Sequence, residues 1–317
     1  MRMDAWAPRL ALLALLLLAG CPHRATPLSD GGPCGWLRLD LGASSTLTSV
    51  WGASNYFVVT EDRAGAGIIH SHDGWEWSRA QTPGGLDSSP VVGVHGSAPD
   101  DVFAVRGTGE VLHYDGAAWA VAATITTKHL RGVFVRRKAD VFAFGQETLA
   151  HFDGTAWTKL APPRGWFLRG AWGRDGVVYA VGWDSAVLAY DGASWQDIGC
   201  SGCSYPEAVS GAPDGTVYVA SSTAKEGVWR VRGGGCTRLE LGDAAPDDRM
   251  LAAAWTTADD TTFLVGTRGL VLRRDGEAWT RLDPGVTADL YGVWAASRDD
   301  VIAVGQAGTA VRYSCTK

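Results

Sequence analysis

Charged and aromatic side chains at one end of a repeated motif are the groups in this chain that could bind a ligand. The core positions of the motif stay constant from copy to copy, whereas the residue that opens its first strand and the loop after its second strand vary. Variable functional groups on a constant frame are typical of a binding site, although each could equally be a solvated loop residue. The candidate ligand-binding residues are Arg106, Arg131, Arg169, Trp183, Asp184, Glu207, Arg268 and Tyr291.

Catalysis would require a convergent acid/base pair among these residues. Glu207 and Arg169 form the only charged pair on neighbouring first strands, which is weak support for an enzyme. The chain contains neither His-Glu-x-x-His nor Gly-x-Ser-x-Gly, and no glycine-rich loop leads into a helix. We therefore expect no catalytic residue and no cofactor. A non-catalytic binding or scaffolding protein for a protein or glycan ligand is favoured; the alternative is a hydrolase or lyase acting on glycans or peptidoglycan.

Two of the six cysteines, Cys200 and Cys203, form a Cys-x-x-Cys motif in the loop after the fourth repeat. A redox pair would need a thioredoxin-type βαβ context, and a metal site would need two further ligands nearby; the sequence supplies neither. We predict a local disulfide between Cys200 and Cys203, and no metal site. Cys236 is then unpaired or replaces one member of the pair. The histidines His95, His113 and His151 occupy aromatic positions of the repeat, where packing explains them.

The repeat itself determines the fold. Its copies lie about 40 residues apart and consist only of short β-type runs, a pattern typical of propeller blades. One position is aromatic in most copies and is occupied by Trp51, His95, Phe134, Trp172, Ser210, Trp255 and Trp294. The sequence therefore predicts an all-β fold, a seven-bladed β-propeller. The fifth copy departs most, because Ser210 replaces the aromatic residue.

Each repeat is expected to form four strands. Two residues before the aromatic position every copy has a small residue, as expected where strands crowd around an axis: Ser49, Gly93, Gly132, Gly170, Ala208, Ala253 and Gly292. In several copies the third strand ends at Asp-Gly, as in Asp115–Gly116, which supplies the positive φ of a tight hairpin. The first-strand openings and the loops after the second strands are expected to surround one mouth of the central channel.

The last copy lacks a fourth strand, because the chain ends shortly after Tyr313. Residues 35–39 match the missing segment, so the N-terminal strand is expected to complete and close the last blade. In this register Cys34 lies beside Cys315, at a Cα–Cα distance of about 5–6 Å, and we predict a disulfide between them. Chain-entropy reasoning gives it roughly 4–5 kcal/mol of stability.

The first twenty residues are predicted to be a targeting segment. Positive charges precede an apolar run over Leu10–Leu18, which is too short to span a bilayer. The run ends in Leu18-Ala19-Gly20-Cys21, which resembles the lipobox of bacterial lipoproteins. The resemblance implies that Cys21 becomes the first mature residue and carries the lipid, including palmitate; the alternative is an ordinary secretory signal. Residues 21–32 read as a flexible tether and residues 33–317 as the propeller domain.

The combined pattern Leu-x-x-Val-Trp-Gly, Asp-Asp-Val-x-Ala-Val-Gly and Tyr-Asp-Gly-x-x-Trp resembles propeller-repeat lipoproteins that are common in myxobacteria and related delta-proteobacteria. A segment at residues 71–77 resembles a shortened Asp-box of the BNR type, which is a structural turn. The resemblance implies a lipid-anchored monomer in the cell envelope, at the outer membrane of a Gram-negative bacterium, with an envelope protein or glycan as partner. The lipid would be its only contact with the membrane. The formal charge of −6 without a basic stripe argues against nucleic acid.

Overall fold

The structure is a computed structural model that describes residues 26–27, 34–53, 56–61, 67–72, 76–80, 82–83, 89–165, 167–246 and 248–315. The targeting segment, Cys21 and the Asp-box turn at residues 73–75 lie outside the described residues, so those assignments stay predictions. Within the described ranges, no helix is long and apolar enough to cross a membrane.

The described strands form seven sheets, six of which are four-stranded. The first four are β3 (Thr46–Gly52), β4 (Tyr56–Glu61), β5 (Gly67–His72) and β6 (Trp77–Ala80); β7 (Val91–Ala98), β8 (Asp101–Arg106), β9 (Glu110–Tyr114) and β10 (Trp119–Thr124); β11 (Leu130–Arg137), β12 (Asp140–Gly145), β13 (Thr148–Phe152) and β14 (Trp157–Lys159); and β15 (Leu168–Arg174), β16 (Val177–Gly182), β17 (Ala186–Tyr190) and β18 (Trp195–Asp197).

The remaining three sheets follow in the same order. They are β19 (Pro206–Gly211), β20 (Val217–Ser221), β21 (Val228–Arg232) and β22 (Gly235–Leu239); β23 (Leu251–Thr256), β24 (Thr262–Gly266), β25 (Leu270–Asp275) and β26 (Ala278–Leu282); and β27 (Leu290–Ser297), β28 (Asp300–Gly305) and β29 (Ala310–Cys315), joined by β2 (Cys34–Arg38) and β1 (Thr26–Pro27). The described helices are short 3-10 turns, namely η2 (Ala224–Glu226), η3 (Gly242–Ala244), η4 (Thr267–Gly269) and η5 (Gln306–Gly308).

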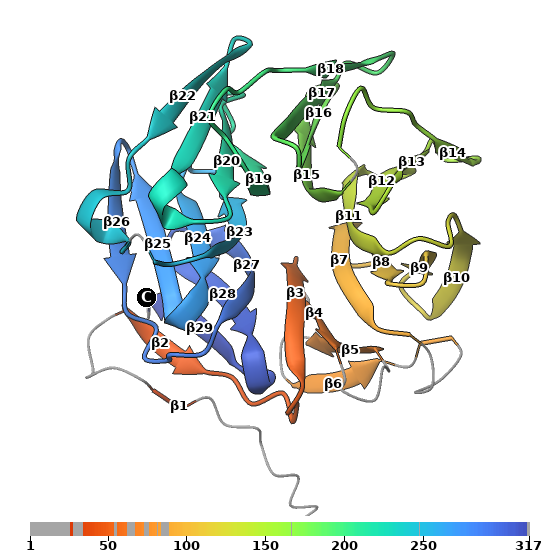
Figure 1. The fold of residues 1–317 in the computed structure, drawn as a ribbon. Coiled ribbons are helices and arrows are strands. Elements are labelled where there is room, and N and C mark those ends of the chain that lie inside the picture. Colours follow the sequence, from red (N-terminus) through yellow and green to blue (C-terminus); the bar gives the residue numbers. More distant parts are fainter. Residues whose placement is uncertain are drawn as a thin grey trace, which may run out of the picture.

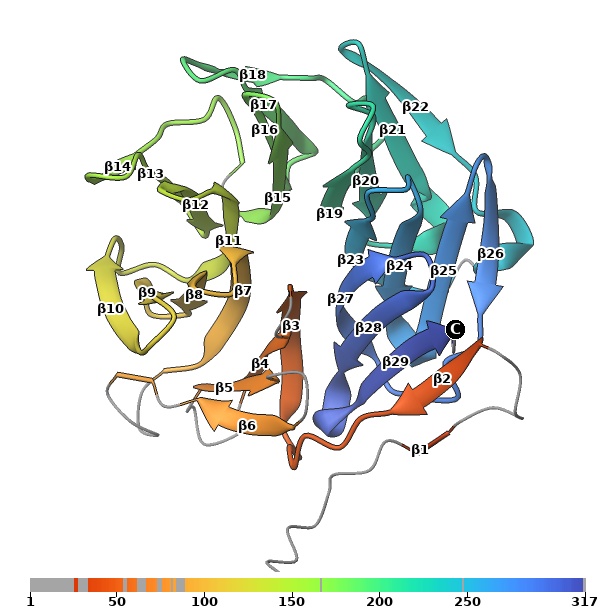
Figure 2. The same ribbon diagram turned by 180° about the vertical axis from the view of Figure 1, so that it is seen from behind.

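The first strand of every sheet lies innermost, and the sheets radiate from the centre (Figures 1 and 2). Each first strand packs against the first strand of the next sheet, and β27 packs against β3. The prediction of an all-β β-propeller is therefore confirmed. Small residues permit this close packing. If Gly93 carried a side chain, its Cβ atom would lie only 3.0 Å from the Cα of Gly132, and a Cβ at Gly292 would lie 3.1 Å from the Cα of Ser49.

Aromatic side chains fill the space between neighbouring sheets. A Cβ on Gly96 would meet the Trp51 ring of the preceding sheet at 2.8 Å, and one on Gly211 would meet the Trp172 ring at 2.4 Å. Each of these glycines therefore leaves room for the aromatic residue of its neighbour. Because the sheets diverge outward, large rings suit these positions.

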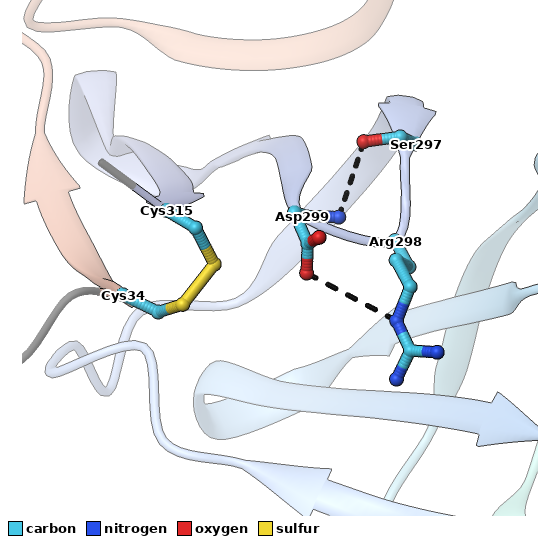
Figure 3. Close-up of a disulfide and its surroundings, with 5 residues drawn as sticks. All are labelled: Cys34, Ser297, Arg298, Asp299 and Cys315. Carbon is cyan, nitrogen blue, oxygen red and sulfur yellow. Dashed lines mark hydrogen bonds and ion pairs between the residues drawn. A yellow bond between two sulfur atoms is a disulfide. The ribbon is translucent and has the colours of Figure 1, made fainter. Parts of the chain in front are cut away.

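The N-terminal strand β2 lies beside the C-terminal strand β29. The two are antiparallel, with Cys34 opposite Cys315 and Arg38 opposite Val311. Cys34 and Cys315 form a disulfide (Figure 3), and their Cα atoms are 3.9 Å apart, closer than the predicted 5–6 Å. The Cys315 amide also donates to the carbonyl of Asp299 in the β27–β28 turn.

The tether prediction needs a correction at two residues. Thr26 and Pro27 form the short strand β1, which pairs antiparallel with Arg38 and Leu37 of β2. At these two residues the chain is therefore attached to the outer edge of the sheet.

The predicted Cys200–Cys203 disulfide is wrong. Cys200 pairs with Cys236 of β22 instead, across a Cα–Cα distance of 5.4 Å, and Cys203 is a free, buried thiol. The pairing of β22 with β21 brings Cys236 to the loop that carries Cys200. Burial raises the pKa of the Cys203 thiol to about 11, and its Sγ lies 3.7 Å from the hydroxyl of Ser221.

Candidate ligand-binding mouth

A β-bulge near the start of every first strand positions the candidate residues. In all seven sheets the register between the first and second strands shifts by one residue just before the small residue. The extra residues are Thr48, Val92, Arg131, Arg169, Glu207, Ala252 and Tyr291. A bulge redirects a side chain out of the regular alternation. All seven residues line one central cavity of about 170 Å³.

The structure thus brings four of the predicted residues together, namely Arg131, Arg169, Glu207 and Tyr291. Arg169 forms a bidentate ion pair with Glu207: its Nε lies 2.9 Å from each carboxylate oxygen, and its Nη2 also donates to Oε1. The Nη2 atom of Arg131 lies 3.9 Å from the same Oε1. Two guanidinium groups therefore converge on one carboxylate, whose side chain is 11% exposed.

An aromatic pair borders this charged cluster. Phe167, directly before β15, stacks on Trp183 in the β16–β17 loop with ring centroids 4.9 Å apart. The Cζ atom of Arg169 lies 5.7 Å from the Phe167 centroid and 5.8 Å from that of Trp183. The guanidinium is thus oriented by Glu207 and by two aromatic rings, and it is half-buried.

Tyr291 lies on the opposite side of the ring of first strands from Arg169. Burial and the neighbouring Asp289 carboxylate, to which the phenol is hydrogen-bonded, raise the pKa of Tyr291. The phenol therefore stays protonated at neutral pH and offers a hydroxyl rather than a phenolate to the cavity.

The predicted ligand-binding residues in the loops after the second strands do not lie together at one site. Arg106 is 2% exposed. Its Nη1 donates to Glu110 at 3.0 Å, and its Nη2 donates to the carbonyl of Pro83. Arg106 is therefore a structural residue, which corrects the prediction that it binds ligand. Arg268 is exposed and pairs with Asp248 at 2.7 Å, away from the cavity lining. The backbone carbonyl of Asp184 accepts from Arg164 at 3.2 Å.

The opposite mouth of the channel carries a basic hairpin, Arg136–Lys138, which was not among the predicted binding residues. A cavity of about 550 Å³ there is lined by the hairpin Arg136–Lys138 together with His95 and Trp255. Arg136 and Arg137 both contact the buried carboxylate of Asp140. Arg136 therefore holds the start of β12, whereas the Arg137 side chain is mostly exposed.

The histidines serve packing, as the repeat predicts. His113 Nε2 lies 2.9 Å from Asp101, and His151 Nε2 lies 2.9 Å from Asp140. His95 is enclosed by aromatic rings, and burial lowers its pKa to about 4. Among the described residues, no three His, Cys, Asp or Glu side chains are grouped so that they could hold a metal ion.

No protein-family model matches the chain, and no curated protein matches it in sequence. Solved structures resemble it in fold. YCF48 bound to a D1 peptide superposes with a TM-score of 0.69 at 14% identity, covering 92% of this chain and 97% of that one. YCF48 from Cyanidioschyzon merolae gives 0.67 at 12%, covering 88% and 98%, and the WD40 β-propeller domain of Doa1 gives 0.70 at 12%, covering 86% and 94%. At these identities the likeness shows the β-propeller fold alone.

Proposed function

We propose that this protein is a non-catalytic binding or scaffolding propeller that captures its ligand at the mouth lined by the seven bulge residues. The observation that carries the proposal is the convergence of Arg131, Arg169, Glu207 and Tyr291 on one cavity through a bulge repeated in every sheet. A regular strand would alternate these side chains with core residues. The bulge instead places one additional residue per sheet at the same cavity.

The polar groups at the mouth are suited to recognition rather than to chemistry. Glu207 is fixed by a bidentate pair with Arg169, so it is poorly placed to transfer protons to a substrate. The raised pKa of Tyr291 keeps its phenol protonated, whereas a tyrosine nucleophile needs the opposite shift. These observations favour binding over the alternative glycan or peptidoglycan hydrolase or lyase.

We also propose how the sheets form the propeller and where the protein lies in the cell. Each of the seven sheets serves as one blade, and β2 closes the ring by completing the last blade; the pairing of Cys34 with Cys315 supports this. Cys21 carries a lipid that anchors a monomer in the envelope of a Gram-negative bacterium, at the outer membrane, on the strength of Leu18-Ala19-Gly20-Cys21. The partner is an envelope protein or glycan, and a resembling propeller solved with a peptide supports the first.

The double variant Arg131→Ala/Arg169→Ala tests the proposal. Two probes are offered to the mature protein, a phage-displayed library of random dodecapeptides and soluble peptidoglycan fragments. We expect one probe class to bind and the variant to bind it at least tenfold more weakly, with a melting temperature within a few degrees of wild type. The matched control Arg174→Ala/Arg232→Ala removes two exposed arginines outside the cavity lining and should bind normally. Unchanged binding by the mouth variant, or its unfolding, would refute the proposal.

A further inference from the structure

The residue directly before each first strand occupies an equivalent place on the rim of the mouth. In six sheets its carbonyl accepts a hydrogen bond, 2.8–3.0 Å long, from the backbone amide of the residue directly after the second strand. Going around the ring, these rim residues are Pro90, His129, Phe167, Tyr205, Met250 and Asp289. The shared hydrogen bond places them at one level, beside the bulge residues that follow two positions later.

Three successive rim residues are large and apolar. Tyr205 is 54% exposed and Met250 is 53% exposed, and Trp183, which covers Phe167, is 46% exposed. We name Phe167, Trp183, Tyr205 and Met250 the apolar arc. Among the large hydrophobic side chains exposed in the described part of the chain, only Val121, on the outer strand β10, lies elsewhere. Isolated exposed apolar residues need no explanation, but a grouped set indicates an interaction surface.

The arc residues belong to three neighbouring sheets. Strand β15 packs against β19, and β19 packs against β23, as Figure 1 shows. The amide of Ser222 donates to the carbonyl of Tyr205 at 2.8 Å, and the carbonyl of Ser222 accepts from Leu251 at 3.0 Å. This short backbone link joins the rim at Tyr205 to the residue that follows Met250.

The inner edge of the arc is positively charged. Arg169 contacts the Phe167–Trp183 stack, and Arg131 lies next to it across Glu207. Among the described residues that line the cavity, Glu207 is the only acidic one, against two arginines. Two arginines against one glutamate leave a net positive charge on this lining, although the chain as a whole carries a formal charge of −6, and this local charge favours an anionic group.

We infer that the apolar arc and the paired arginines form one docking surface for a protein segment that carries a carboxylate beside large apolar side chains. The inference rests on the proposed function and specifies its ligand. Guanidinium groups recognise carboxylates in defined geometry. The Tyr205 ring can stack on an apolar side chain or on a sugar ring, but the flexible thioether of Met250 has no ring face for a sugar and packs best against apolar side chains. A protein segment therefore contacts the whole arc and also supplies the carboxylate, which favours it over a glycan.

The test uses the same random dodecapeptide library on wild type and on Tyr205→Ser/Met250→Ser. We expect the wild type to enrich peptides with Asp or Glu within two residues of Phe, Leu, Trp or Met. Synthetic copies should bind the arc variant at least tenfold more weakly by fluorescence polarisation, and copies with Asn or Gln for the acid should lose as much. Val121→Ser, an exposed apolar residue on another surface, is the matched control and should bind normally.

Several outcomes would overturn the inference. If selected peptides depend on Arg131 and Arg169 but bind the arc variant as well as wild type, the proposed function stands and the docking surface is wrong. If only peptidoglycan fragments bind, and they depend on the two arginines, the ligand class is wrong. If no probe depends on the arginines, both proposals fail. Both arc side chains are half exposed, so the variant should fold; circular dichroism checks this.

Discussion

At the scale of single residues, buried aspartates tie the second strand of a sheet to the third. Asp140, at the start of β12, is 4% exposed. Its Oδ1 lies 2.9 Å from Nε2 of His151 on β13, and its Oδ2 accepts from Nε of Arg136 at 2.8 Å. Burial opposes ionisation, but the hydrogen bonds from Arg136 and His151 outweigh it and hold the pKa of Asp140 below its ordinary value.

We predict that Asp140→Asn lowers the free energy of unfolding at pH 7 by about 1–3 kcal/mol, because it removes charge-assisted bonds to buried partners. A folded-state pKa below the unfolded value gives stability that is complete above the unfolded pKa and is lost as the pH falls through the folded one. The difference between wild type and variant should therefore shrink as the pH falls below the ordinary pKa of an aspartate. Urea titrations at pH 7 and pH 3 measure it.

The exposed Asp175→Asn is the control for this variant and should be nearly neutral at both pH values. A difference that persists unchanged at pH 3 would show that Asp140 acts by shape rather than by charge.

At the scale of elements, the bulged first strands pack against one another around the centre, and their bulge residues line the central cavity. We predict that Gly93→Val destabilises the protein by about 1–3 kcal/mol, since overpacking forces backbone shifts. The new Cβ would lie 3.0 Å from the Cα of Gly132 and 3.3 Å from the carbonyl of Arg131. Because Arg131 is the neighbouring bulge residue, ligand binding should weaken as well.

Equilibrium urea unfolding measures the effect of Gly93→Val. The control is Gly235→Val, where a Cβ meets only the carbonyl of Arg232 at 3.6 Å. The control should change stability by less than about 0.5 kcal/mol. Equal effects of the two substitutions would contradict the close approach of β7 and β11.

The sequence predicted the strands well because their signals are local. Small residues such as Gly93 mark backbone crowding, and the match of residues 35–39 to a fourth strand predicts the register of Cys34 with Cys315. Arg131 and Arg169 were found as candidates because they vary on a constant frame. The bulge that directs them inward was not predicted, because a one-residue slip in register leaves no mark on the alternation of a single strand.

Other features depend on contacts between distant segments. Arg106 reads as a loop residue, and only the position of the Pro83 carbonyl shows that it is buried and bonded. Cys236 lies far from Cys200 in sequence, and strand pairing between β21 and β22 selects it over Cys203. The sequence indicates the rim position of Tyr205 and Met250 only weakly. Both residues directly precede a first strand, and this shared position can be recognised only when the repeats are aligned by their strands.

At the scale of the whole molecule, the first and last described segments of the propeller are joined by a disulfide. We predict that Cys34→Ala/Cys315→Ala lowers the free energy of unfolding by up to about 5 kcal/mol, since the bond closes a loop with a sequence separation of 281. Amide hydrogen exchange should become faster first in β2 and β29, because the removed disulfide joins these two strands directly.

The variant Cys200→Ala/Cys236→Ala provides the comparison. It removes a bond with a sequence separation of 36 and should leave exchange in β2 and β29 unchanged. If the Cys34–Cys315 variant shows uniform exchange across all sheets, unfolding does not start at the paired strands β2 and β29.

The pairing of β2 with β29 also has a consequence for biosynthesis. A ribosome completes Cys34 long before Cys315, and at about 5–20 residues per second the interval is roughly 15–60 s. During this time β2 lacks its partner β29, while the sheets from β3 onward can form one after another. Strand β2 is thus made early but joins its sheet late, and a chain interrupted before residue 310 leaves the edge of β2 that faces β29 unpaired. Such an edge is a site for chaperone capture or aggregation, so the protein is most vulnerable in the interval before β29 is made.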